Sequence, residues 1–110
     1  MPVTRVETRA GWISERREEV IAAIGRAVAT GLHLADPGTL IVTEHAETAF
    51  RAPPGVGQRY VLVDVVLFAG RSAEWKLAVK HELAAGLAGF GLAASDINLT
   101  FHEVDPSNAP

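Results

Sequence analysis

An internal repeat constrains the fold of this chain more than any other feature, because the order strand, helix, strand occurs twice within 110 residues. Each copy has a first strand, an Ala-Gly pair, a serine, an apolar run with helical spacing, a turn and a second strand. We expect the copies to span residues 2–45 and 60–104, with a linker at 46–59 and a short tail at 105–110. The Pro- and Gly-rich part of the linker interrupts both patterns, so we predict one domain, residues 1–110, built from two βαβ units.

In the first copy, strands are predicted at residues 2–8 and 39–44. Ser14 is the expected N-cap of the helix between them, and Gly31 is its expected end. Asp36-Pro37-Gly38 has the composition of a turn. The apolar stripe of the helix comprises Val20, Ile21, Ile24, Ala27 and Val28.

In the second copy, residues 60–68 (YVLVDVVLF) are almost continuously apolar, which is typical of a strand buried on both faces. Ser72 is the expected N-cap of the next helix, which should end at Gly89 or Gly91. The last strand is predicted at residues 97–104. The stripe of this helix comprises Trp75, Val79, Leu83, Leu87 and Phe90.

Two right-handed βαβ crossovers in one sheet place both helices on the same face. We therefore expect an α+β fold, with a four-stranded mixed sheet and two helices on one side. Because the strand at 60–68 is too apolar to leave the other face in water, we expect a further subunit to cover that face.

Composition excludes several classes of function. The formal net charge is −3, and the arginines of the first helix alternate with glutamates, so we expect no nucleic-acid partner. There is no cysteine, which fits a cytoplasmic protein, and no apolar run approaches the ~18 residues that cross a bilayer. The start of the chain lacks the apolar stretch of a signal peptide. The four histidines are scattered, so we expect no metal, nucleotide or other cofactor.

Proline directly follows Met1, and this position is a candidate for catalysis. Removal of the methionine would leave Pro2 with a free secondary amine, which is both basic and nucleophilic. Burial and a nearby guanidinium each disfavour the protonated form, so both favour a neutral amine at physiological pH. A neutral amine of this kind is suited to moving a proton from an enol or an α-carbon.

Taken together, these residues resemble the tautomerase superfamily, whose members begin with proline after methionine and are built from βαβ units. Residues 69–76 (AGRSAEWK) are similar to the Gly-Arg-Ser/Thr-x-Glu-x-Lys signature that opens a helix in these enzymes, and residues 42–45 (VTEH) resemble the Ile-Thr-Glu segment of a following strand. The tandem layout is most similar to the malonate semialdehyde decarboxylase-like branch. The resemblance implies a tautomerase or MIF-like fold, a homotrimer and a cofactor-independent isomerase.

The resemblance also implies roles for individual residues. Pro2 would be the general base or acid for keto–enol tautomerisation of a small 2-keto or 2-hydroxyalkenoic acid. Arg71 would bind the substrate carboxylate and stabilise the enolate. Asp36, His45 and Tyr60 are weaker candidates for substrate binding, and an Asx-turn role is the more ordinary interpretation of Asp36.

The chain departs from the family pattern at three places. Ala69 stands where the decarboxylase-like proteins carry a first arginine, Trp12-Ile13 occupies the place that Arg71 holds in the second copy, and the usual C-terminal tail is absent or reduced to Asn108. We therefore expect one site, near Pro2, and favour tautomerase activity. Decarboxylase or hydratase activity at the same site stays open, and so does a non-catalytic ferredoxin-like binding or assembly domain.

Overall fold

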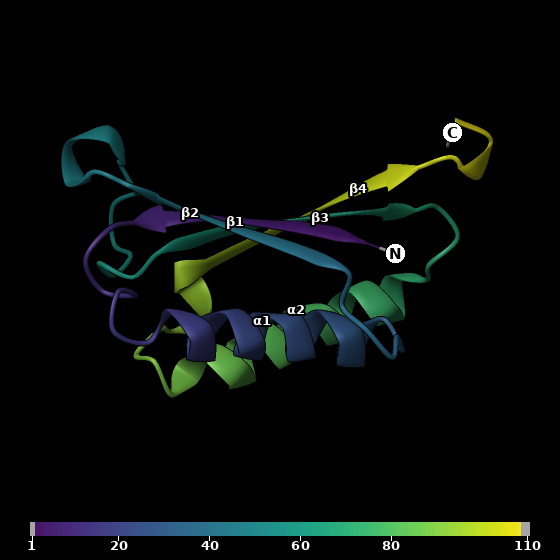
Figure 1. Cartoon of the computed structure of the whole chain (residues 1–110), viewed down its shortest axis with the longest axis horizontal. Helices are drawn as coiled ribbons and strands as arrows, with labels where there is room; N and C mark the ends of the chain where they lie inside the picture. The colour runs from purple at the N-terminus through teal and green to yellow at the C-terminus, as the bar shows by residue number, and fades with distance from the viewer. Residues whose placement is uncertain (1, 109–110) are drawn as a thin grey trace.

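Four strands and two helices form two layers in the computed structural model, which describes residues 2–108 (Figure 1). Both helices lie against one face of the sheet, and the repeated order of elements is the predicted one. The elements are β1 (Val3–Arg9), α1 (Arg17–Gly31), β2 (Thr39–His45), β3 (Val61–Phe68), α2 (Ala73–Ala88) and β4 (Ile97–Val104). The predicted α+β fold is confirmed.

The order of strands across the sheet is β2-β1-β3-β4. Each copy contributes one parallel pair, β1 with β2 and β3 with β4, and the two copies join through the antiparallel pair β1 and β3. Val3 at the start of β1 therefore lies opposite Val66 near the end of β3. The central antiparallel pair makes the sheet mixed and relates the copies by an approximate two-fold axis.

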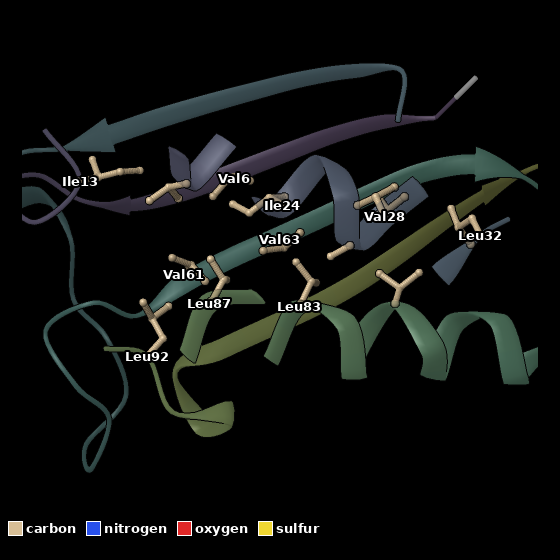
Figure 2. Close-up of a cluster of buried hydrophobic side chains, with 14 of the residues drawn as sticks. Val6, Ile13, Ile24, Val28, Leu32, Val61, Val63, Leu83, Leu87 and Leu92 are labelled. Carbon is tan, nitrogen blue, oxygen red and sulfur yellow. The ribbon is translucent and has the colours of Figure 1, made fainter. Parts of the chain in front are cut away.

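The core lies between the helices and one face of the sheet (Figure 2). Side chains alternate between the two faces of a strand, so Val6 of β1 and Val61 and Val63 of β3 point toward the helices and are buried. From the helices, Ile24, Leu83 and other stripe residues meet them. The predicted stripes are confirmed for Val20, Ile24, Ala27, Val28, Val79, Leu83 and Leu87.

The two helices begin differently. Ser72 is the N-cap of α2, and its hydroxyl accepts a hydrogen bond from the backbone nitrogen of Trp75 at 3.3 Å. The predicted N-cap at Ser14 is wrong, because α1 begins only at Arg17 after a turn. In that turn the carbonyl of the fully buried Ile13 accepts a hydrogen bond from the Arg16 backbone nitrogen. Burial of Ile13 thus holds the chain in a turn before the helix can start.

The second face of the sheet carries no helix within residues 2–108 (Figure 1). Its surface is mixed: Arg5 and Glu7 come from β1, whereas β2 exposes Ile41 at 42% and β3 exposes Phe68 at 48%. Neither α1 nor α2, the helices of the described chain, is long and apolar enough to cross a membrane.

Candidate active site

The topology brings the start of β1 and the end of β3 to the same end of the sheet (Figure 1). Pro2 directly precedes β1, and Arg71 follows β3 by three residues, so the antiparallel pairing places both at this end. Both line one open cavity of about 320 Å³. The other residues of its lining are Leu32, Leu34, Leu67, Phe68, Ala69, Gly70 and Trp75. We call it the proline cavity.

The guanidinium of Arg71 is held in place from two sides. Its Nη1 donates a hydrogen bond to the carbonyl oxygen of Leu32, just after α1, at 2.9 Å. Its Cζ lies 4.9 Å from the ring centroid of Trp75, one helical turn further along the chain. The bond to Leu32 uses one of the five N–H donors of the guanidinium, so the group is oriented and keeps capacity to bind an anion.

His33, which follows the end of α1, packs against Trp75 as well. This residue has a φ of 56°, in the left-handed region, and its ring lies 4.8 Å from that of Trp75. Trp75 therefore contacts an aromatic ring as well as the guanidinium of Arg71. The contacts fix the tryptophan as a wall of the proline cavity.

Pro2 is buried, and the turn before β2 packs directly against it. The Pro2 carbonyl accepts a hydrogen bond from the Thr39 backbone nitrogen at 3.2 Å. Gly38, with a φ of 80°, approaches so closely that a Cβ at this position would lie 2.2 Å from the Pro2 oxygen. Only glycine permits this approach. Met1, whose removal would free the Pro2 nitrogen, lies outside the described residues.

Asp36 stabilises the turn before β2. Its Oδ1 accepts a hydrogen bond from the Gly38 backbone nitrogen at 2.7 Å, which is the Asx-turn geometry. Asp36 is not among the residues that line the proline cavity. Its contact with the cavity is indirect, because it fixes the glycine that packs against Pro2.

His45 and Tyr60 lie at the opposite end of the sheet in the same chain. His45 ends β2, beside Arg9, and its Nε2 lies 3.0 Å from Glu7 Oε1. Tyr60 precedes β3, is buried, and its hydroxyl accepts a hydrogen bond from Asn98 Nδ2 at 3.1 Å. Within one chain, neither side chain lines the proline cavity.

Sequence reasoning did not assign Leu32, Leu34 or Trp75 to the site. Trp75 was expected only as part of the core stripe of α2, although its place four residues after Arg71 puts the two side chains on neighbouring turns. The two leucines follow α1, and a helix in a βαβ unit runs back toward the start of its first strand. This rule places the end of α1 beside Pro2, so the sequence could have assigned the two leucines to the site.

The proline cavity is apolar apart from one charge. Among the described residues of its lining, Arg71 is the charged side chain, and the leucines, Phe68 and Trp75 supply the walls. Such a cavity fits a small acid with an apolar substituent, because the guanidinium can bind one carboxylate while the walls contact carbon. Within residues 2–108, no three His, Cys, Asp or Glu side chains come together as a metal site.

Comparison with known proteins identifies the family. A family model described as "Tautomerase enzyme" matches residues 38–108, more than half of the chain. The chain therefore belongs to the tautomerase family. No curated protein matches the sequence.

Solved structures share the fold over nearly the whole chain. FG41 malonate semialdehyde decarboxylase inhibited by 3-bromopropiolate is 24% identical, with a TM-score of 0.82 over 98% of this chain and 87% of that one. A structure of malonate semialdehyde decarboxylase is 16% identical, with a TM-score of 0.84 over 98% and 88%. Native fused 4-OT is 19% identical, with a TM-score of 0.82 over 98% and 91%. These identities establish the shared fold alone.

Proposed function

We propose that this protein is a cofactor-independent keto–enol tautomerase in which Pro2 moves the proton and Arg71 binds the substrate. The substrate class is a small 2-keto or 2-hydroxyalkenoic acid. The observation that supports this proposal most is that Pro2 and Arg71, 69 positions apart in sequence numbering, line one cavity.

Pro2 becomes a base once Met1 is removed, since its nitrogen is then a secondary amine rather than an amide. Burial disfavours the protonated amine, and the positive charge of Arg71 disfavours it further. The neutral amine removes the hydroxyl proton of the enol and delivers it to the carbon at the far end of the double bond. In the opposite direction it removes the proton from that carbon and delivers it to the oxygen. One group thus serves as base and then as acid.

Arg71 makes the proton transfer possible by stabilising negative charge. Its orientation by Leu32 and Trp75 allows it to bind a carboxylate without further reorganisation. Because the described lining supplies one guanidinium and apolar walls, we expect a substrate with one carboxylate and an apolar substituent to be turned over better than a dicarboxylate.

A second candidate is decarboxylation or hydration at the same site. The structural similarity to malonate semialdehyde decarboxylase favours it, and a protonated Pro2 could polarise a carbonyl or a water. Ala69, which stands where the decarboxylase-like proteins carry the first of two arginines, weighs against this activity. Release of carbon dioxide from malonate semialdehyde, compared with ketonisation under the same conditions, separates the two activities.

We also propose that the protein is a homotrimer, since a fused 4-OT that shares its fold is a symmetric trimer. The uncovered face of the sheet, with Ile41 and Phe68 exposed, supports an assembly. His45 and Tyr60 could then approach a substrate only in a cavity shared with a neighbouring subunit. The alternative is a non-catalytic assembly domain, and a lack of activity in the assay would indicate it.

The direct test is an ultraviolet assay of ketonisation, with phenylenolpyruvate as the monoacid and 2-hydroxymuconate as the diacid. We expect kcat/KM to fall by roughly 10²–10⁴-fold in Pro2→Ala, because the secondary amine is replaced by a primary amine without the ring that positions its nitrogen. In Arg71→Gln it should fall by about 10²–10³-fold, because one stabilising donor group is lost. Intact mass of the active protein should show that Met1 is absent.

Arg51→Gln is the matched control, because Arg51 is an exposed arginine in the linker. It should keep the activity of the unmodified protein. If Pro2→Ala and Arg71→Gln are as active as the control, or if the active protein retains Met1, the proposed mechanism is wrong.

A further inference from the structure

A second cavity of about 340 Å³ lies at the end of the sheet opposite the proline cavity, with Trp12, Arg16, Arg59 and Phe90 in its lining. We propose that this cavity binds the carboxylate of a small aromatic monoacid without converting it. The proposal does not depend on the proposed tautomerase activity, since it concerns a different cavity and different side chains.

The second cavity is the counterpart of the proline cavity in the internal repeat. Gly11 follows β1 with a φ of 114°, and Gly70 follows β3 with a φ of 116°, so the backbone turns in the same way at both places. Trp12 then stands where the second copy has Arg71. The two cavities thus share a positive-φ glycine after the strand, and they differ in the loop and the side chains that follow it.

An arginine nevertheless reaches the equivalent carbonyl in both cavities. Arg71 donates to the carbonyl of Leu32, just after α1, and Arg59 Nη1 donates to the carbonyl of Phe90, just after α2. Arg59 comes from the chain before β3 rather than from the chain after a strand. Arg59 therefore comes from a different position in the repeat than Arg71, but its guanidinium binds the corresponding carbonyl.

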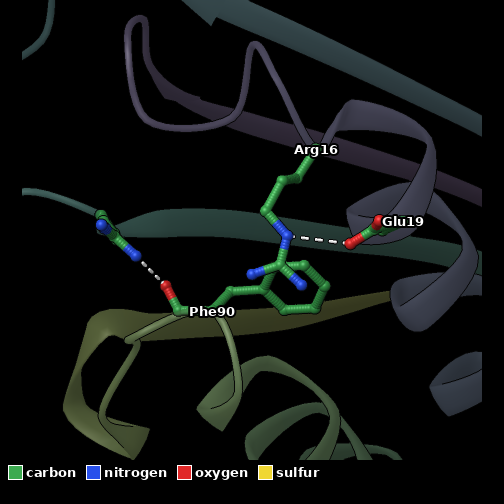
Figure 3. Close-up of polar contacts among 4 residues, drawn as sticks. Arg16, Glu19 and Phe90 are labelled. Atoms are coloured by element: carbon green, nitrogen blue, oxygen red, sulfur yellow. Dashed lines mark hydrogen bonds and ion pairs between the residues drawn. The ribbon is translucent and has the colours of Figure 1, made fainter.

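A second guanidinium faces the same cavity. Arg16 Nε donates to Glu19 Oε2 at 2.8 Å, which leaves its two terminal nitrogens over the ring of Phe90 (Figure 3). Its Cζ lies 4.3 Å from the centroid of that ring. Bound in this way, Arg16 presents N–H groups next to an aromatic surface.

These side chains define the ligand chemistry. Two guanidiniums can bind a carboxylate, and the rings of Phe90 and Trp12 can contact a planar apolar group. Glu15 also lines the cavity, so a second negative charge on the ligand would be repelled. An aromatic acid with one carboxylate meets all three conditions.

The terminal amine that would move the proton in the proline cavity has no counterpart among the described residues that line the second cavity. In the repeat, the residue that corresponds to Pro2 is Tyr60, whose backbone nitrogen is an amide inside the chain. It cannot accept a proton at physiological pH. We therefore expect binding without turnover.

The chain holds two tryptophans, Trp12 in the second cavity and Trp75 in the proline cavity, so each cavity has its own reporter. The experiment follows the two indole N–H signals of the ¹⁵N-labelled full chain by NMR while phenylacetate is added. Trp12→Phe assigns the signals, and phenylacetamide serves as the uncharged control ligand. We expect the Trp12 signal to shift saturably with phenylacetate and to shift at least ~10-fold more weakly with phenylacetamide, because the charge-assisted hydrogen bonds are lost.

Arginine variants test which groups bind the carboxylate. Arg59→Gln and Arg16→Gln should each weaken the Trp12 response by about 10-fold, since each removes charge-assisted hydrogen bonds. Arg51→Gln should not weaken the response, and a Trp75 signal that matches that of the unmodified protein before phenylacetate is added shows that each variant is folded. Arg16→Gln decides the outcome if Arg59→Gln does not fold.

Three results would overturn the proposal. The Trp12 signal could stay unmoved at every phenylacetate concentration, or it could respond equally to phenylacetamide. It could also lose its response in Arg71→Gln while keeping it in Arg59→Gln and Arg16→Gln. That last result would mean that Trp12 reports a change transmitted from the proline cavity.

Discussion

At the scale of single residues, the position of Pro2 depends on a glycine. Gly38 combines a φ of 80° with a contact so close that a Cβ would overlap the Pro2 carbonyl oxygen. The Asp36 carboxylate accepts a hydrogen bond from the Gly38 backbone nitrogen, and the Thr39 backbone nitrogen donates one to the Pro2 carbonyl. The turn before β2 therefore sets where the ring of Pro2 lies in its cavity.

Gly38→Ala should displace Pro2 and lower activity, because the new methyl group cannot occupy the space of the Pro2 carbonyl. We expect a loss of at least about 10-fold in kcat/KM and a stability loss of roughly 1–3 kcal/mol, measured by ketonisation and by urea unfolding.

Gly55→Ala is the matched control, because Gly55 also has a positive φ, 89°, but within residues 2–108 no atom beyond its chain neighbours lies within 4 Å of where the new Cβ would be. It should lose about 1–2 kcal/mol through backbone strain and keep full kcat/KM. Equal activity in the two variants would show that the turn does not position Pro2.

At the scale of elements, the two helices pack closely because α1 ends in a glycine. A Cβ on Gly31 would lie 2.5 Å from Val79 Cγ2 and 2.6 Å from the Val79 backbone nitrogen. The sequence predicted Gly31 as a helix stop, and α1 does end there. The left-handed residue, however, is His33, so close approach of the helices is what requires a glycine at position 31.

Gly31→Ala should force α1 and α2 apart and cost about 1–3 kcal/mol of unfolding free energy, as overpacking does in other cores. Gly89→Ala is the control, since Gly89 has an ordinary helical φ of −65° and the described part of the chain leaves open space for a Cβ there. It should be neutral or gain up to roughly 1 kcal/mol. Urea unfolding compares the variants, and equal stability would contradict the packing argument.

The repeat made the strands and helices predictable, whereas contacts between them were harder to foresee. Ser72 caps its helix as expected, because residues 68–71, directly before it, are not buried. Ser14 fails as a cap because burial of Ile13 overrides the local preference. The antiparallel pairing of β1 with β3 follows from neither copy alone. That pairing brings Arg71 to Pro2 and leaves His45 at the other end of the sheet.

At the scale of the whole molecule, the face of the sheet that no helix covers within residues 2–108 is the expected interface between subunits. Ile41→Glu should dissociate the proposed trimer, because a charge at this exposed apolar position would be buried at the interface. Leu77→Glu is the control, since Leu77 is 51% exposed but belongs to α2, in the helical layer. Sizing by light scattering should show a smaller particle for Ile41→Glu alone. If the unmodified protein is a monomer, the assembly proposal is wrong.

The state of the Pro2 nitrogen tests the central claim most directly. In a ¹⁵N-proline-labelled sample of the six prolines, a free terminal amine is the proline nitrogen that titrates. We predict one titrating signal whose pKa lies below that of an ordinary secondary amine, because burial and Arg71 disfavour its charged form. Arg71→Gln should raise this pKa, since a nearby positive charge is removed, and the acidic limb of kcat/KM should move with it. A spectrum without any titrating proline nitrogen, or a pKa that Arg71→Gln leaves unchanged, would contradict the account.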